Sequence, residues 1–132
     1  MRYVLDTNFV IKYFRRDPQA VDVLRSLTVP QVSFSIMTYL ELVQGEVLAG
    51  RTRSSLNLSG FVRPYELLPL SVEAAKYAGR EALRLGRGRT HNDMHDLAIG
   101  ATAREFGRTV LTENVADFAP LSGVRVKNWR DL

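Results

Sequence analysis

Short apolar runs alternate along the chain with longer segments in which apolar residues recur at helical spacing. Apolar runs of this length, some of them interleaved with polar residues, are typical of β-strands. We predict strands at residues 2–5, 31–37, 65–70, 109–112 and 124–129.

The segments between these runs predict helices, because their apolar residues share a face and several begin at capping residues. The expected helices cover residues 9–14, 18–27, 39–50 behind a Thr38 cap, 52–62 ending before Pro64, a segment opened by Ser71, and a segment that starts near residue 92. Strands that alternate with helices predict an α/β fold with a largely parallel sheet and helices on both of its faces.

Length and composition narrow the picture further. With 132 residues and no cysteine, we expect residues 1–132 to form one domain without disulfides or thiolate metal sites, as suits a reducing compartment. The apolar runs are too short to span a bilayer, and Asp6 interrupts the first of them too early for a signal peptide. We therefore expect a soluble, cytoplasmic protein.

The chain carries a formal net charge of +4, and its basic residues are unevenly placed. Lys76, Arg80, Arg84 and Arg87 fall at the spacing of one helical stripe. Such a stripe is either a solvated helix face or a contact for nucleic-acid phosphates, and the sequence leaves both interpretations open.

Polar residues follow two of the predicted strands. Asp6 comes directly after the first strand, and Asn114 and Asp117 follow the fourth. Ligands of open α/β sheets bind beyond the carboxyl ends of the strands, so these side chains are candidates for a site. For Asp6 taken alone, a helix N-cap is the favoured interpretation.

Two further carboxylates lie within predicted helices. Glu41 has apolar neighbours in YLELV, and because an unpaired buried carboxylate is costly we expect it to have a cationic partner. Asp96 shares a helix face with Gly100 and Ala103, small residues that let a helix pack closely on the sheet and leave the carboxylate facing a cleft.

Several acids at one edge of a sheet need a positive charge to hold them together. Oxygen ligands without cysteine favour a hard cation, Mg²⁺ or Mn²⁺, over zinc. Such a cation lowers the pKa of water and offsets charge on a phosphate, and beside a basic surface this arrangement suits a phosphodiesterase.

The segment THNDMHD, residues 90–96, has an alternative interpretation. His91 and His95 stand at a spacing that can clamp zinc on a helix. Residues 90–92, however, fall before or at the helix start, so we expect His91 to lie off the face that carries His95. Thr90 or Asn92 is then the cap and Asp93 a first-turn acid favoured by the helix dipole, which leaves Asp96 as the functional member.

Four segments, in this order, resemble the PIN-domain ribonucleases and among them the VapC-type toxins of bacterial toxin–antitoxin pairs. The segments are VLDTN at 4–8, SIMTYLELVQG at 35–45, DLAIGATAREFG at 96–107 and TENVADF at 112–118. The resemblance implies a three-layer α/β/α sandwich whose five-stranded, mainly parallel sheet has the order 3-2-1-4-5.

The resemblance also implies endonucleolytic cleavage of RNA with Mg²⁺ or Mn²⁺, inhibition by a cognate VapB-type antitoxin, and homodimers that assemble further with it. The family's acidic positions fall on Asp6, Glu41 and Asp96, with Asn114 at the fourth and Asp117 close by. Asp6 and Asp96 would hold the metal directly, and Glu41 directly or through water. The neutral Asn114 leaves open whether a second metal binds.

Other residues are assigned to the substrate. Thr7 and Asn8 match family positions that orient the first carboxylate, and Arg80, Arg84 and Arg87 are our candidates for RNA contacts. Gly100 stands where the family more often has alanine, which should only tighten packing.

Two rival functions remain. A phospho-receiver domain is also α/β and binds Mg²⁺, but it carries paired acids after its first strand, where this chain has Asp6 followed by Thr7. A non-catalytic RNA-binding or adaptor protein would gain nothing from buried negative charge, and metal binding would separate it from a nuclease.

Overall fold

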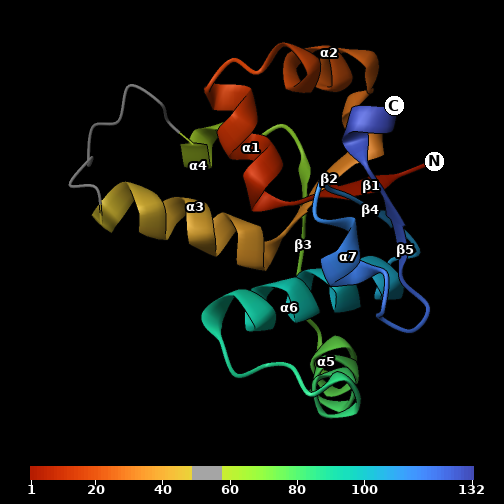
Figure 1. Cartoon of the computed structure of the whole chain (residues 1–132). Coiled ribbons are helices and arrows are strands. Elements are labelled where there is room, and N and C mark those ends of the chain that lie inside the picture. The colour runs from red at the N-terminus through yellow and green to blue at the C-terminus, as the bar shows by residue number, and fades with distance from the viewer. Residues whose placement is uncertain (49–57) are drawn as a thin grey trace.

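The computed structural model describes residues 1–48 and 58–132 (Figure 1). Within them the strands are β1 (Tyr3–Leu5), β2 (Val32–Ser35), β3 (Glu66–Leu68), β4 (Thr109–Leu111) and β5 (Arg125–Lys127). The helices are α1 (Thr7–Phe14), α2 (Pro18–Ser26), α3 (Ile36–Leu48), α4 (Leu58–Phe61), α5 (Val72–Leu85), α6 (His91–Glu105) and α7 (Val115–Phe118), with 3₁₀ turns at Val29–Gln31 and Trp129–Asp131.

The strands form one parallel sheet in the order β3-β2-β1-β4-β5, which confirms the order that the resemblance implied. β1 lies at the centre, where Leu5 stands opposite Phe34 of β2 and Leu111 of β4. Phospho-receiver domains have the order 2-1-3-4-5, so this topology excludes that rival.

Side chains of the sheet alternate between two hydrophobic cores. Tyr3 and Leu5 face a core shared with Phe9 and other residues of α1, α2 and α3. Val4 faces the opposite core, which Leu97 and other residues of α6 and α7 complete, and α5 packs on the outside of α6. The layers are those of the expected α/β/α sandwich (Figure 1). None of the described helices has the length and apolar character to cross a membrane.

The predicted boundary between β2 and α3 is wrong. The strand was expected to run to residue 37 with Thr38 as the helix cap, but α3 begins at Ile36 and Thr38 is buried inside it. Ser35 ends the strand, and its hydroxyl accepts the backbone N–H of Met37 at 3.0 Å. The apolar run continues through the first helical turn, so the pattern gave no sign of the change.

Other predicted elements are present with shorter bounds. The strand expected at 65–70 covers Glu66–Leu68, and the last one covers Arg125–Lys127. The helix expected at 52–62 is described from Leu58 to Phe61, and its first residues lie outside the described ones. The helix after Ser71 is as predicted, since the Ser71 hydroxyl accepts the backbone N–H of Ala74 and caps α5.

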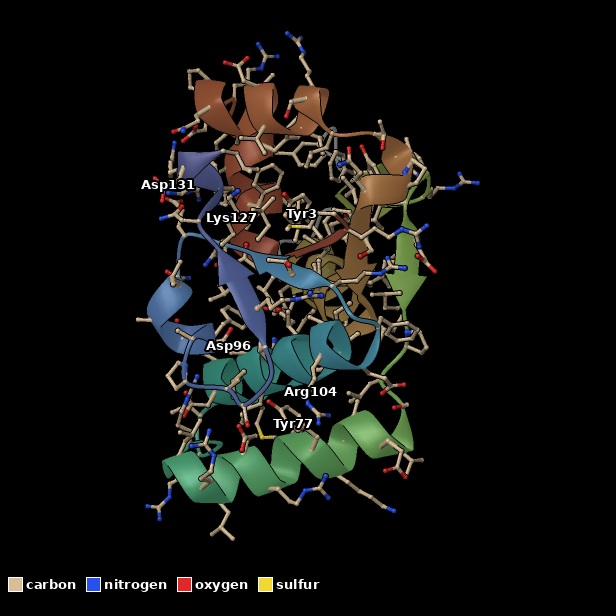
Figure 2. The ribbon with its side chains drawn as sticks, turned by 90° about the vertical axis from the view of Figure 1, so that its right-hand side faces the viewer. Tyr3, Tyr77, Asp96, Arg104, Lys127 and Asp131 are labelled. Atoms are coloured by element: carbon tan, nitrogen blue, oxygen red, sulfur yellow. The ribbon has the colours of Figure 1, made fainter. Side chains whose placement is uncertain are left out.

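A buried carboxylate joins α5 to the loop before β5. Glu81 is 6% exposed and accepts two hydrogen bonds from Arg84, at 2.7 and 2.8 Å, and one from the backbone N–H of Ser122 at 2.6 Å. The Arg84 guanidinium and the Ser122 N–H lower the pKa of Glu81 to about 2. Figure 2 shows Tyr77 of the same helix beside Arg104 of α6, whose guanidinium carbon lies 4.4 Å from the centre of the Tyr77 ring.

Candidate functional site

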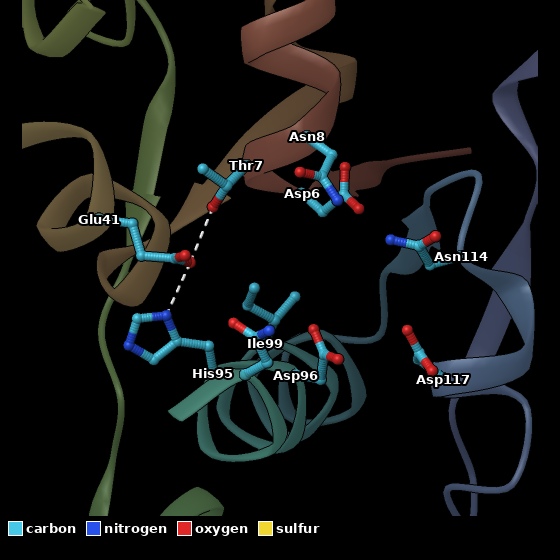
Figure 3. A pocket seen from close by; sticks show the side chains of 10 residues that line it. Asp6, Thr7, Asn8, Glu41, His95, Asp96, Ile99, Asn114 and Asp117 are labelled. Atoms are coloured by element: carbon cyan, nitrogen blue, oxygen red, sulfur yellow. Dashed lines mark hydrogen bonds and ion pairs between the residues drawn. The ribbon is translucent and has the colours of Figure 1, made fainter. Parts of the chain in front are cut away.

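A pocket of about 200 Å³ opens at the carboxyl ends of β1 and β4, between α1, α3, α6 and α7 (Figure 3). It brings together every acidic or amide residue that the sequence placed at the site, with Thr7 and Asn8 beside them. The lining residues are Asp6, Thr7, Asn8, Glu41, Asn92, His95, Asp96, Ile99, Asn114 and Asp117.

Asp6 directly follows β1 and is both a helix cap and a pocket residue. Its Oδ1 accepts the backbone N–H of Phe9 at 3.0 Å, and its Oδ2 accepts the hydroxyl of Thr112 at 2.6 Å. Asp6 is 5% exposed. This burial raises the pKa of the carboxyl, and the bonds from Thr112 and Phe9 oppose the rise. The two interpretations that the sequence left open are therefore compatible.

Glu41 projects from α3 toward the pocket. Its Oε1 accepts the hydroxyl of Thr7 at 2.8 Å and lies 2.9 Å from Nδ1 of His95. The second contact is short, but it is not a well-aligned hydrogen bond. The sequence predicted a cationic partner for Glu41, and a histidine faces it.

Asp96 is a second pocket carboxylate whose negative charge the protein leaves poorly balanced. Burial raises the pKa of Asp96 to about 6, and the negative charge of Asp117 adds to the rise. Arg87 opposes it from 3.9 Å, the distance between its Nη2 and Oδ2 of Asp96, which is beyond hydrogen-bond reach. The pocket therefore favours a positive charge beside Asp96, either a proton or a cation.

Asn114 and Asp117 line the side of the pocket opposite Glu41 and His95 (Figure 3). Asn114 is the N-cap residue of α7, yet its side chain makes no cap hydrogen bond, and its backbone N–H donates to the Thr112 hydroxyl at 2.9 Å. Its amide is thus available to the pocket. Asp117 lies in the first turn of α7 and faces Asp96 across the pocket.

The arginines of the basic stripe lie outside the pocket lining, although Arg87, which follows α5, contacts Asp96 and Asp117. Arg80 is exposed on α5, and Arg84 is bound to Glu81. Arg87 donates to the backbone carbonyl of Asp117 at 2.8 Å. None of the three arginines lines the pocket, so their assignment to RNA remains a prediction.

In the segment THNDMHD the cap is Thr90, whose hydroxyl accepts the backbone N–H of Asp93 at 3.1 Å. The expectation that His91 lies off the face of His95 is wrong. Already in the first turn of α6 the two rings are neighbours, with centroids 4.1 Å apart. Asp93 lies outside the pocket lining, and its carboxylate accepts the backbone N–H of Gly88.

Sequence analysis did not identify three residues of the site. The Thr112 hydroxyl forms hydrogen bonds with Asp6 and with the backbone N–H of Asn114. Thr112 follows β4 as Asp6 follows β1, and this matching position at the end of TVLT could have identified it. Asn92 and His95 line the pocket from the start of α6. His95 could have been found as the partner that Glu41 required.

The donor chemistry of the pocket fits a hard cation. Its charged donors are carboxylate oxygens, and the raised pKa of Asp6 and of Asp96 shows that their negative charge is under-compensated. Within residues 1–48 and 58–132, no three acidic or histidine side chains stand close enough to enclose an ion as they are placed.

Known proteins resemble this chain over most of its length. The family model described as the PIN domain matches residues 3–119. The chain is 27% identical over 130 residues to the tRNA(fMet)-specific endonuclease VapC of Salmonella typhimurium, with 98% of each chain covered. A solved DNA-bound VapBC from Salmonella typhimurium superimposes with a TM-score of 0.76 at 25% identity, covering 98% of each chain. VapBC-1 from nontypeable Haemophilus influenzae, at 22% identity, has the same fold with a TM-score of 0.78, covering 98% of this chain and 99% of that one.

Proposed function

The chain belongs to the PIN-domain family of nucleases, and on that premise we propose that it is a Mg²⁺- or Mn²⁺-dependent endoribonuclease acting as the toxin of a toxin–antitoxin pair. Nucleases of this family generally use a divalent metal. The observation that carries the proposal is the pocket itself, in which the buried Asp6 and the half-buried Asp96 both have raised pKa values. Among the described residues, neither carboxylate accepts a hydrogen bond from an arginine or a lysine. A pocket of this charge attracts a divalent cation, and a bound cation would suit a phosphodiester as the substrate.

In this proposal Asp6 and Asp96 hold the ion, and Glu41 meets it directly or through water. When bound, the ion lowers the pKa of water and offsets the charge that develops on the scissile phosphate. Thr112 and the N–H of Phe9 fix the orientation of Asp6, so that little rearrangement is needed there. Water attacks the phosphorus, one ester P–O bond breaks, and the leaving oxygen takes up a proton, so that no protein side chain acts as a nucleophile.

The neutral side chains of the pocket suit the RNA backbone. Asn8, Asn92 and Asn114 line it with amide groups that can donate to phosphate oxygens without adding charge. Thr7 also lines the pocket, and Asp117 faces Asp96 there as a further acid. Arg80 and its neighbours on α5 extend the contact by attracting phosphates outside the pocket.

Partners follow from the relatives. Because solved neighbours are VapBC complexes, we propose a VapB-type antitoxin as the inhibitor of this chain, and a homodimer as the form to which it binds. The Salmonella relative is named for tRNA(fMet), so structured tRNA is the first substrate class to test. We place this activity in the cytoplasm, with residues 1–132 acting as one PIN-like domain.

The test is cleavage of tRNA by purified protein freed of any inhibitor, with Mg²⁺ or Mn²⁺ and with excess EDTA. We expect cleavage with either ion and none in EDTA. An Asp96→Asn preparation, purified in parallel, controls for contaminating nucleases. Cleavage that persists in EDTA excludes metal dependence, and the absence of cleavage with every ion, while RNA still binds, supports the RNA-binding rival.

A further inference from the structure

His95 lines the pocket, but the proposed cleavage reaction gives it no task. It lies in α6 one residue before Asp96, and its side chain is 6% exposed. Figure 3 shows its ring next to Glu41, on the side of the pocket away from Asn114 and Asp117. A buried histidine inside an acidic pocket needs a physical explanation.

Both recorded contacts of the Glu41 carboxylate fall on the same oxygen. Oε1 accepts the Thr7 hydroxyl at 2.8 Å and faces Nδ1 of His95 at 2.9 Å. Thr7 stands at the start of α1 and His95 in α6, so two elements fix a side chain that projects from a third, α3. Among the described residues no hydrogen bond is made to the other oxygen, Oε2.

The surroundings of the His95 ring commit it to this contact. Nδ1 is buried and, in the described part of the chain, has no aligned hydrogen bond, so the attraction of Glu41 is its principal polar interaction. A ring nitrogen that faces a carboxylate carries a proton there, which fixes the tautomer. The ring of His91, an exposed residue, is a neighbour of the His95 ring, with centroids 4.1 Å apart.

We propose that His95 is a positioning residue for Glu41. Together with Thr7 it holds Oε1 and leaves Oε2 free to meet the cation or its hydration water. A glutamate side chain has several rotatable bonds, and holding it in place beforehand removes the entropic cost of ordering it when the ion binds. The inference rests on the proposed function, because it concerns how Glu41 meets the ion.

The geometry provides a matched pair of variants. The amide nitrogen of asparagine reaches about the position of histidine Nδ1, whereas that of glutamine reaches about the position of Nε2. His95→Asn therefore keeps the contact with Glu41, and His95→Gln loses it. His95→Leu removes the donor altogether and is made alongside, so that the conclusion does not depend on one variant folding.

The main measurement is the affinity for Mn²⁺ by calorimetry, without RNA. We expect His95→Gln and His95→Leu to bind Mn²⁺ at least about 10-fold more weakly, and His95→Asn to bind as the wild type does. In a Glu41→Gln background the same His95 changes should cost no further affinity. His91→Asn, a histidine change one turn earlier on the exposed surface, should leave the affinity unchanged.

A structure of metal-free His95→Gln gives a readout that needs no ion. There the Glu41 carboxylate should leave Thr7, and a carboxylate that stays in place overturns the proposal. Equal Mn²⁺ affinity of the wild type, His95→Gln and His95→Leu also overturns it, as does a full additional loss in the Glu41→Gln background. These failures leave the nuclease proposal standing as long as the wild type cleaves RNA. A wild type that neither binds Mn²⁺ nor cleaves RNA removes the nuclease proposal itself.

Discussion

Two carboxylates, the buried Glu81 on α5 and the half-buried Asp96 on α6, have opposite electrostatic surroundings. Glu81 has the more buried side chain, 7% exposed against 26% for Asp96. Yet the pKa of Glu81 is lowered to about 2, whereas that of Asp96 is raised to about 6. Arg84 and the N–H of Ser122 bind Glu81 directly, while Arg87 stays 3.9 Å from Asp96.

The difference shows that burial alone does not set the chemistry of a carboxylate. Removal from water raises the pKa of both groups, and bound donors outweigh it in Glu81. At Asp96 the negative charges of neighbouring acids raise the pKa further. The structural carboxylate is neutralised by the protein, and the pocket carboxylate is left for something else to neutralise.

Removing the pocket charge should have the largest effect. Asp96→Asn keeps the shape of the side chain but deletes a ligand charge, so RNA cleavage should fall more than about 100-fold. Because the pKa of Asp96 lies above its ordinary value of 3.8, ionised Asp96 destabilises the metal-free fold, and stability is lost as pH rises through about 6. Metal-free Asp96→Asn should therefore be more stable than the wild type at pH 8, by about 1–3 kcal/mol, and equally stable near pH 4.

Denaturant titrations at the two pH values, beside tRNA cleavage assays, measure both effects. A variant that loses stability at pH 8 would contradict the electrostatic account even if it were inactive.

Binding of a cation beside Asp96 should have the next largest effect, because it supplies the positive charge that the protein lacks there. Mn²⁺ at about 100 times its dissociation constant should stabilise the wild type by about 2.7 kcal/mol at pH 8. The gain should shrink below about pH 6, because a proton then competes for Asp96. Thermal denaturation with and without Mn²⁺ measures this, and Asp96→Asn serves as the control. A gain that is independent of pH would place the ion elsewhere.

At Glu81, the carboxylate paired with Arg84, we expect a substitution to lower the stability of the protein and to leave RNA cleavage unchanged. Glu81→Gln removes an ion pair and weakens the bond from Ser122, which should cost about 2 kcal/mol. The pKa of Glu81 is lowered from 4.5, so its contribution is complete above that pH and is lost as pH falls through about 2. The gap between variant and wild type in urea titrations should close over this range, with RNA cleavage unaffected where both are folded.

Glu73→Gln is the matched control for this comparison. Glu73 lies on the same helix, its side chain is 78% exposed, and it is 3.6 Å from Lys76. Its replacement should change stability by less than about 0.5 kcal/mol. Equal losses in the two variants would mean that burial and bound donors contribute nothing at Glu81.

The smallest expected effect concerns the helix that carries Asp96. A methyl group added at Gly100 would overlap Cδ1 of Leu121, a buried side chain that must turn away, and we expect Gly100→Ala to cost about 1 kcal/mol. The alanine of related sequences is thus not a neutral exchange here. Gly79→Ala on α5 meets nothing within 4 Å and should instead stabilise the protein by about 0.5–1 kcal/mol. Thermal denaturation of both variants checks the opposite signs.

Much of this architecture could be predicted from the sequence because its patterns are local. Strand-type runs that alternate with amphipathic helices specify a parallel α/β sheet, and the resemblance supplied the strand order that was confirmed. The start of α3 could not be predicted, since apolar residues continue from β2 into the helix and Ser35 caps it without interrupting the run.

The site could be predicted where a polar residue follows a buried strand, as at Asp6 and Asn114. Its internal contacts could not, because they join residues far apart in the chain. Thr112 resembles the last residue of a strand until its bond to Asp6 is seen. His95 resembles half of a zinc clamp until Glu41 is found facing it from α3.

The central position of β1 has a consequence for how the protein is made. β1 pairs with β4 as well as with β2, and Asp6 is held by Thr112, more than a hundred residues later in the chain. Contacts of such long sequence separation form slowly and only after both partners exist. During synthesis the acidic pocket therefore cannot assemble until the segment from Thr109 to Asp117 has emerged. Until then, a growing polypeptide carries no completed pocket.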